Sequence, residues 1–147
     1  MSFTVIGIDP GRSGALARVG PGIQDAQVYK LDNTDRDVYE KLMEFAEGAD
    51  FAYLEKVGAM PKQGVSSTFK FGRSFGFLGG ILVATGLPFE LVTPQKWQGY
   101  LSCRTKGDKN VTKARAQELF PDIRCTHVVS DALLIAEYGR RVLGEKQ

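Results

Sequence analysis

The run of residues 3–11, Phe-Thr-Val-Ile-Gly-Ile-Asp-Pro-Gly, constrains the fold more than any other stretch of the chain. Its apolar and β-branched residues predict a buried strand, and the Pro-Gly pair predicts a turn directly after it. Asp9 therefore stands at the end of a core strand, where a carboxylate is costly to bury unless it is paired or binds a metal ion. An acid that closes the strand in an Asx turn explains the same pattern.

The next segments predict an antiparallel meander followed by a helix. Residues 13–19 and 23–31 have strand-like sequences, and the Gly-Pro-Gly sequence between them is a strong turn signal. A helix follows, capped by Thr34 or Asn33 and stopped by Gly48. Its apolar residues recur at helical spacing and predict one buried face: Val38, Leu42, Phe45 and Ala46.

Residues 50–55 form a short apolar run that again has an acid, Glu55, at its end. The order strand, helix, strand is that of a βαβ crossover, which pairs this run in parallel with the first strand. If the two strands are neighbours, Asp9 and Glu55 converge at one edge of the sheet, where open α/β sheets place their sites. Two acids at the same topological end indicate a site more strongly than one acid does.

The second half of the chain predicts a helix over residues 65–86, a last strand over 89–92 and three further helices. The long helix has apolar residues that we expect in the core: Phe69, Phe75, Phe77, Leu78, Ile81 and Leu82. It also has glycines that favour close packing against the sheet or a partner helix: Gly72, Gly76, Gly79 and Gly80. In the helix that Thr93 and Pro94 begin, Trp97 and Tyr100 belong either to the core or to a surface that stacks on bases.

A third acid, Asp131, lies in the first turns of the final helix, which we expect over residues 126–143. It interrupts an otherwise apolar stripe, which makes it a candidate ligand. Helix residues four apart share a face, so His127 and Asp131 point the same way. His127 is either a cap or surface residue, or a metal ligand or catalytic partner.

The composition predicts one cytoplasmic domain. A length of 147 residues with 43% hydrophobic content suits a single domain, residues 1–147, with a sizeable core. No apolar run is long enough to span a membrane, and no signal peptide precedes the first strand. Cys103 and Cys125 form no CxxC or zinc-type pattern and are interpreted as reduced thiols.

Charge is distributed unevenly along the chain, although the net charge is only +2. Residues 56–115 contain ten basic and two acidic side chains, whereas the rest of the chain contains nine basic and fifteen acidic ones. A basic centre between acidic flanks indicates a polyanionic partner, with a solvated basic face as the alternative. The candidate contacts to the phosphates of such a partner are Lys56, Lys62, Lys70, Arg73, Lys96, Arg104, Lys106 and Lys113.

In order and spacing, several segments resemble the RuvC-type Holliday-junction resolvases, which belong to the RNase H-like nuclease superfamily. The segments are Gly7-Ile8-Asp9-Pro10-Gly11, Leu54-Glu55-Lys56-Val57, residues 62–76, Lys109-Asn110-Val111 and Ser130-Asp131-Ala132-Leu133. The resemblance implies an RNase H-like α/β fold with a five-stranded mixed sheet, three antiparallel and then two parallel strands, flanked by helices. It also implies metal-binding carboxylates at Asp9, Glu55 and Asp131. A catalytic lysine of the family is best matched by Lys109.

The chain departs from the family pattern at three places. The family's fourth metal-binding group usually precedes the final Asp by three residues, a position that Val128 occupies here, whereas His127 lies four residues before that Asp. A family lysine in the preceding helix falls at Gln98, with Lys96 as a substitute, and the family's aromatic wedge falls at Gly58. These departures favour a divergent, phage-encoded member.

The expected chemistry is metal-dependent hydrolysis of DNA at four-way junctions. Carboxylate ligands suit Mg²⁺ or Mn²⁺, and two ions about 4 Å apart in each active site clamp one phosphodiester. Lys109 offsets charge on the phosphate, and His127 serves as a ligand or orients the attacking water. The expected products are paired symmetric nicks with 5′-phosphate and 3′-hydroxyl ends, formed by a homodimer that uses the helix over residues 65–86 as its interface. We expect neither a membrane partner nor a nucleotide cofactor.

Other functions fit parts of the sequence. An RNA-processing nuclease of the same fold would use the same acids, and a non-catalytic junction-binding protein would need only the basic segment. An actin-like ATPase requires a second phosphate-binding loop and a longer chain than these 147 residues. An α/β protein with incidental acids requires no site.

Overall fold

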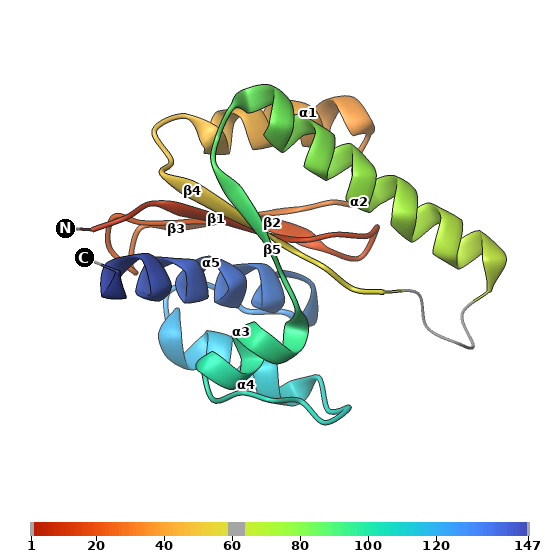
Figure 1. The fold of residues 1–147 in the computed structure, drawn as a ribbon. Coiled ribbons are helices and arrows are strands. Elements are labelled where there is room, and N and C mark those ends of the chain that lie inside the picture. The colour runs from red at the N-terminus through yellow and green to blue at the C-terminus, as the bar shows by residue number, and fades with distance from the viewer. Residues whose placement is uncertain (1, 59–63, 147) are drawn as a thin grey trace.

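The computed structural model describes residues 2–58 and 64–146, which form a central sheet with helices on both faces (Figure 1). The elements in chain order are β1 (Val5–Asp9), β2 (Ala15–Val19), β3 (Ala26–Lys30), α1 (Asp35–Ala46), β4 (Phe51–Glu55), α2 (Val65–Thr85), β5 (Phe89–Val92), α3 (Pro94–Tyr100), α4 (Asn110–Leu119) and α5 (His127–Glu145). The candidate DNA contact Lys62 lies outside the described residues. Within the described ranges, none of the helices combines the length and the apolar character needed to cross a membrane.

The sheet has the strand order β3-β2-β1-β4-β5, with β1 at its centre. The pairs β1-β2 and β2-β3 are antiparallel, and the pairs β1-β4 and β4-β5 are parallel. Because β4 runs beside β1 in the same direction, the register aligns Ile8 with Leu54 and brings the carboxyl ends of the two strands together. The predicted mixed sheet, with three antiparallel and then two parallel strands, is confirmed.

The second and third strands are shorter than the sequence predicts. Backbone hydrogen bonds of 3.1 and 3.0 Å close turns over Gly11–Gly14 and Gly22–Asp25. β2 therefore begins at Ala15 and β3 begins at Ala26. Ile23 favours a strand by itself, but it lies in the second turn, because tertiary context overrides a weak local preference.

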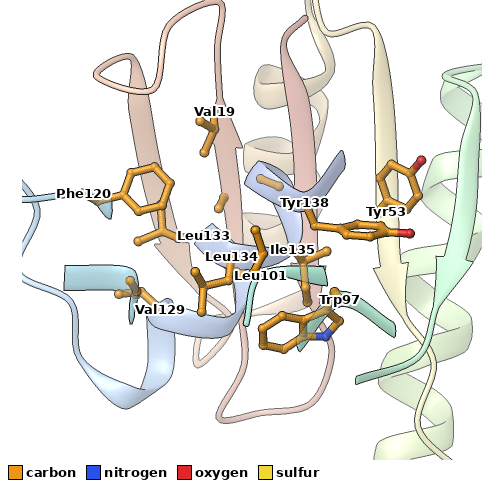
Figure 2. Close-up of a cluster of buried hydrophobic side chains, with 14 of the residues drawn as sticks. Val19, Tyr53, Trp97, Leu101, Phe120, Val129, Leu133, Leu134, Ile135 and Tyr138 are labelled. Atoms are coloured by element: carbon orange, nitrogen blue, oxygen red, sulfur yellow. The ribbon is translucent and has the colours of Figure 1, made fainter. Parts of the chain in front are cut away.

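The two faces of the sheet are covered by different helices. α1 and α2 cover one face, and α5 lies along the other, with α3 and α4 on its outer side (Figure 1). Strand side chains alternate between the faces, so Ile6 and Ile8 pack under α1 and α2, whereas Val5 packs under α5. Figure 2 shows the α5-side cluster, to which α5 contributes Leu133 and α3 contributes Trp97.

Helix α5 can pack directly on β1 because Gly7 has no side chain. A Cβ atom at Gly7 would lie 2.3 Å from the carbonyl oxygen of Ala132 and 2.5 Å from the backbone nitrogen of Ala136. Only glycine allows this approach between the strand and the helix backbone. The contact fixes the position of Ala132 and therefore of its neighbour Asp131.

The predicted amino-terminal caps of two helices are confirmed. The Thr34 hydroxyl accepts a hydrogen bond from the amide of Asp37 at 3.1 Å and so begins α1. Thr93 caps α3 through the amide of Lys96, and Pro94 is the first helical residue. These caps satisfy amides that have no partner inside the helix.

Helix α2 contributes fewer residues to the core than its sequence predicts. Its core residues lie in the carboxyl-terminal half: Leu78, Ile81 and Leu82, with Phe75 and Phe77 partly buried beside them. Phe69 is 72% exposed, so its predicted core position is wrong. The reason is that the amino-terminal half of α2 extends past the ends of the strands, as Figure 1 shows.

The glycines of α2 pack against the sheet at one position. A Cβ atom at Gly79 would lie 3.8 Å from Leu54. A Cβ atom at Gly72, Gly76 or Gly80 would meet none of the described residues within 4 Å, so close packing of these three glycines on the sheet is wrong. The alternative expectation, packing against a partner helix, stays a prediction.

Candidate active site

Strand alternation directs the two strand-end acids to the α5 face of the sheet. In β1, Val5 and Gly7 face α5, and so Asp9, two residues further along, points the same way. In β4, Tyr53 belongs to the α5-side cluster, and Glu55 follows it by two residues. Because β1 and β4 are parallel neighbours, the two carboxyl groups meet beside α5.

The carboxyl groups of Asp9 and Glu55 lie close enough for each to affect the pKa of the other. Burial raises the pKa of Asp9 well above its usual range, and the charges of Glu55 and Asp131 add to this shift. Burial also raises the pKa of Glu55 to about 7, with a further contribution from Asp131. Ionising both acids would place like charges side by side in a poorly solvated position, which is unfavourable.

Asp131 is the third acid at this point, in the second turn of α5. Its carboxyl is partly buried, and burial raises its pKa. The neighbouring Thr112 and the charges of Lys109 and His127 oppose this increase. His127 is the exposed first residue of α5, and its effect on Asp131 agrees with the predicted shared helix face. Its role as a metal ligand stays a prediction.

Lys109 lies immediately before α4 and close to the acids. Its positive charge lowers the pKa of both Asp9 and Asp131. The side chain is exposed, so its ammonium group is accessible to a phosphate that approaches the acids. Lys109, the residue predicted to act as the catalytic lysine, therefore lies beside Asp9 and Asp131. Its catalytic role stays a prediction.

The acids do not form a closed set of ligands in this conformation. Among residues 2–58 and 64–146, no three Asp, Glu, His or Cys side chains are arranged to hold a metal ion together. What the fold brings together is the Asp9–Glu55 pair, with Asp131 close enough to raise the pKa of both members. The donors are hard oxygen atoms, and burial, with the charge of Asp131 in the case of Asp9 and Glu55, makes their ionised forms costly in a way that a divalent cation would offset. The residue types therefore fit Mg²⁺ or Mn²⁺.

Trp97 is a neighbour of the acids that the sequence analysis does not identify. Its indole Nε1 donates a hydrogen bond of 2.7 Å to Glu55 Oε2, and the indole is 0% exposed. The core position of Trp97 is confirmed, and stacking on bases is excluded for a side chain that the solvent does not reach. The structure explains the contact: β5 pairs in parallel with β4, so the helix that follows β5 begins beside the end of β4.

Thr112 is a second polar neighbour that the sequence did not indicate. It is buried on α4, its hydroxyl donates a hydrogen bond of 3.3 Å to the carbonyl oxygen of Lys109, and its presence lowers the pKa of Asp131. Tyr100, in contrast, is exposed and packs edge-on against Tyr138 at a centroid distance of 5.2 Å. Helix α3 therefore places a buried donor against Glu55, and α4 places the buried Thr112 beside Asp131.

The candidate DNA contacts lie on several surfaces of the molecule. Six of them are exposed: Lys56, Lys70, Lys96, Arg104, Lys106 and Lys113. Arg73 is also exposed, and it forms an ion pair with Asp35 that links α2 to α1. Gly58, where the family has its wedge, is exposed as well.

An open groove of about 980 Å³ lies on the opposite side of the sheet from α5. It runs from the turn after Asp9 between the start of α1 and α2, and its lining includes Lys70 and Arg73. Acidic residues line it too, namely Asp32, Asp35 and Asp37. Because its charge is mixed and the three acids do not line it, this groove is a poorer path for DNA than the α5 side.

The raised pKa values predict that the cation-free protein loses stability as the pH rises. Glu55 has a pKa of about 7 in the folded chain against an ordinary value of 4.5, so between these values only the folded state holds the proton. The stabilisation is present below the ordinary value and is lost as the pH rises through about 7, by about 3 kcal/mol. Urea unfolding in EDTA at a series of pH values measures how the free energy of unfolding depends on pH, and this dependence is expected to be weaker in Glu55→Gln. An equally strong pH dependence in Glu55→Gln would contradict the role given to the Glu55 carboxyl.

Comparison with known proteins gives matches among solved structures. No family model matches the sequence, and no curated protein matches it. A structure of Thermus thermophilus RuvC in complex with Holliday junction substrate has a TM-score of 0.68 at 16% identity, covering 97% of this chain and 96% of that chain. A second structure of Thermus thermophilus RuvC has a TM-score of 0.60 at 18% identity, with 95% and 96% covered.

These matches extend over nearly the whole chain. Both come from Thermus thermophilus, so neither supports the expected phage origin. The resemblance drawn from the order of the motifs is confirmed at the level of the fold. The chain has the RNase H-like fold of the RuvC Holliday junction resolvases.

Proposed function

We propose that this chain is a metal-dependent DNA endonuclease that resolves four-way junctions by paired, symmetric nicks. The observation that carries the proposal is the closeness of Asp131 to the Asp9–Glu55 pair, whose pKa values its charge raises, although the three acids lie far apart in the sequence. One of the RuvC structures with this fold is a complex with Holliday junction substrate. Carboxyl groups whose pKa is raised by burial, and in Asp9 and Glu55 also by the charge of Asp131, are typical of functional sites.

The three acids would hold Mg²⁺ or Mn²⁺, with two ions in each active site. His127 is the candidate for a further ligand. When bound, such cations activate a water and stabilise the leaving oxygen of a phosphodiester. Lys109 is near Asp9 and Asp131 and exposed, so it can offset charge on the phosphate under attack. In-line displacement of the 3′-oxygen leaves a 5′-phosphate and a 3′-hydroxyl, which are ends that a ligase can seal.

The α5 side of the molecule is the proposed DNA surface. The acids face this side, and the segment from α3 to α4 that borders it carries Lys96, Arg104, Lys106 and Lys113, all exposed. Contacts of this kind are made to phosphates, so affinity is expected to fall steeply with salt. Lys70 and Arg73 lie on the α2 side and would contact a different arm of a branched substrate.

A homodimer would match the two-fold symmetry of a four-way junction, and α2 is the proposed interface. Exposed apolar residues and open glycines follow one face of this helix at intervals of three or four residues: Val65, Phe69, Gly72, Gly76, Gly80 and Val83. Val65 is 89% exposed and Val83 is 70% exposed, which is unusual for apolar side chains on a helix. Glycines on such a face allow two helix backbones to approach closely.

We expect Phe69→Glu to convert the dimer to monomers, because it buries a charge at the centre of the proposed interface. Sedimentation velocity measures this directly, with Tyr39→Glu on the exposed face of α1 as the control. Phe75 packs against the core, so a charge there would test folding rather than assembly. A Phe69→Glu protein that sediments as an unchanged dimer would remove α2 as the interface.

The experiment that tests the proposed function is incubation with a synthetic four-way junction and Mg²⁺, beside a linear duplex of the same sequence and a structured RNA. The expected result is paired nicks at symmetric positions in the junction and intact duplex and RNA. Cleavage of the RNA in preference to the junction would favour an RNA-processing nuclease. Tight junction binding without cleavage would favour a non-catalytic binding protein.

A further inference from the structure

The hydrogen bond between Trp97 and Glu55 joins a helix to a strand-end acid inside the core. The indole Nε1 donates to Glu55 Oε2 at 2.7 Å, and Glu55 is 5% exposed. Because neither side chain is accessible to water, water does not compete for this bond. The contact follows from the sheet register, since Val92 at the end of β5 lies opposite Glu55 and α3 begins directly after it.

The position of the indole is fixed from two sides. Trp97 packs in the α5-side cluster, whose members include Leu101 and Leu133 (Figure 2). A backbone hydrogen bond of 2.8 Å from Lys56 to Val92 holds the ends of β4 and β5 together at the start of α3. The packing of the ring and the backbone bond at the start of α3 together hold the indole N–H in place against Glu55.

An indole has one N–H donor and no acceptor. If the Glu55 carboxylate turned away, this donor would remain buried without a partner, which is unfavourable. The bond therefore commits Oε2 to Trp97 and leaves Oε1 free of the indole. Phe at this position would fill most of the same space and provide no donor.

We propose that Trp97 is a positioning residue, which holds Glu55 through Oε2 so that Oε1 is presented to the divalent cation. The inference rests on the proposed function, because it requires that Glu55 bind a cation. Groups that orient a metal ligand from outside typically contribute about 10- to 100-fold to metal affinity. A Trp97 with only a packing role would affect stability and leave the metal affinity of the folded protein unchanged.

The test compares Trp97→Phe with Leu101→Val, which loosens the same packing layer and keeps the indole donor. Calorimetric titration with Mn²⁺ is expected to give about tenfold weaker binding in Trp97→Phe and unchanged binding in Leu101→Val. Junction binding in EDTA is expected to be equal in both, which shows that the folded surface is intact. Equal Mn²⁺ affinity in the two variants would overturn the inference.

A second variant removes the donor with almost no change of shape. The chain has one tryptophan, so growth with 3-benzothienylalanine in place of tryptophan replaces only Trp97 and substitutes sulfur for the N–H. This protein is expected to lose Mn²⁺ affinity as Trp97→Phe does. Wild-type affinity in the sulfur analogue would overturn the inference even if Trp97→Phe folds poorly.

The single tryptophan also reports on the bond directly. Mg²⁺ added to the wild type is expected to change the emission of Trp97, and the change is expected to be absent in Glu55→Gln. An emission change that persists in Glu55→Gln would overturn the inference. Junction cleavage by the wild type decides the proposed function separately. A wild-type protein that binds Mn²⁺ and cuts no junction contradicts that function. The difference in Mn²⁺ affinity between Trp97→Phe and Leu101→Val still decides the role of Trp97.

Discussion

Replacing Asp9 by Asn is expected to abolish junction cleavage while junction binding is retained. Asp9 ends the central strand and is the acid in contact with Glu55 and under the influence of Asp131. Asn keeps the shape of the side chain and removes the negative charge that a divalent cation requires. Because the loss of a group that stabilises the transition state typically costs two or three orders of magnitude, we expect the rate to fall by about 1,000-fold or more.

The measurement is single-turnover cleavage of a labelled four-way junction at saturating Mg²⁺, with junction binding measured in parallel. Asp122→Asn, an exposed acid away from the site, is the matched control and is expected to cut at the wild-type rate. In the absence of cation, Asp9→Asn is expected to be at least as stable as the wild type, because it relieves the repulsion within the Asp9–Glu55 pair. Wild-type cleavage by Asp9→Asn would contradict the site assignment.

Replacing Gly7 by Ala is expected to be strongly destabilising, although it adds only one methyl group. The new Cβ would lie 2.3 Å from the carbonyl oxygen of Ala132 and 2.5 Å from the amide nitrogen of Ala136. These are backbone atoms of α5, so no side-chain rotation relieves the clash and the helix itself must move away from β1. We expect the free energy of unfolding to fall by about 3 kcal/mol, at the upper end for overpacking.

The displacement of α5 also carries Asp131 away from the other two acids, so cleavage is expected to fall at temperatures where the variant is still folded. Urea unfolding gives the stability, and Gly144→Ala on the same helix is the control. A Cβ at Gly144 meets none of the described residues within 4 Å, so this variant is expected to be unchanged or more stable by up to about 1 kcal/mol. Equal stability of Gly7→Ala and Gly144→Ala would contradict the packing described for β1 and α5.

The position of Asp9 and Glu55 could be predicted because it follows from local pattern and topology together. Each acid ends an apolar run, and the intervening helix requires the two runs to be parallel. Alternation along the strands then places both acids on one face, as the structure has it. Asp131 could be predicted for a different reason: a charged residue in the apolar stripe of a buried helix needs a partner in the core.

Trp97 could not be identified as a neighbour of Glu55 because its contact depends on the register between β4 and β5. The sequence predicts both strands, but their relative register depends on packing across the sheet rather than on either segment alone. The same limit applies to Thr112, whose contact with Asp131 depends on how α4 lies against α5. Buried donors of this kind become visible only when the tertiary structure is known.

The error at Phe69 has another cause. An aromatic residue at helical spacing with core residues was predicted to be in the core, yet this part of α2 extends past the strands and leaves the ring 72% exposed. Helical periodicity identifies an apolar face and does not say which surface covers it. The same face, with Gly72 and Gly76 open on it, becomes intelligible if a second molecule covers it.

The central claim is that carboxylates from β1, β4 and α5 form one centre for divalent cations. Crystals grown with Mn²⁺, measured for anomalous scattering, test this claim most directly. The account predicts anomalous peaks between Asp9, Glu55 and Asp131, with the Asp131 side chain turned toward the pair, and no such peaks in crystals of Asp9→Asn. A wild-type crystal that shows Mn²⁺ bound elsewhere, with none at these three acids, would contradict it.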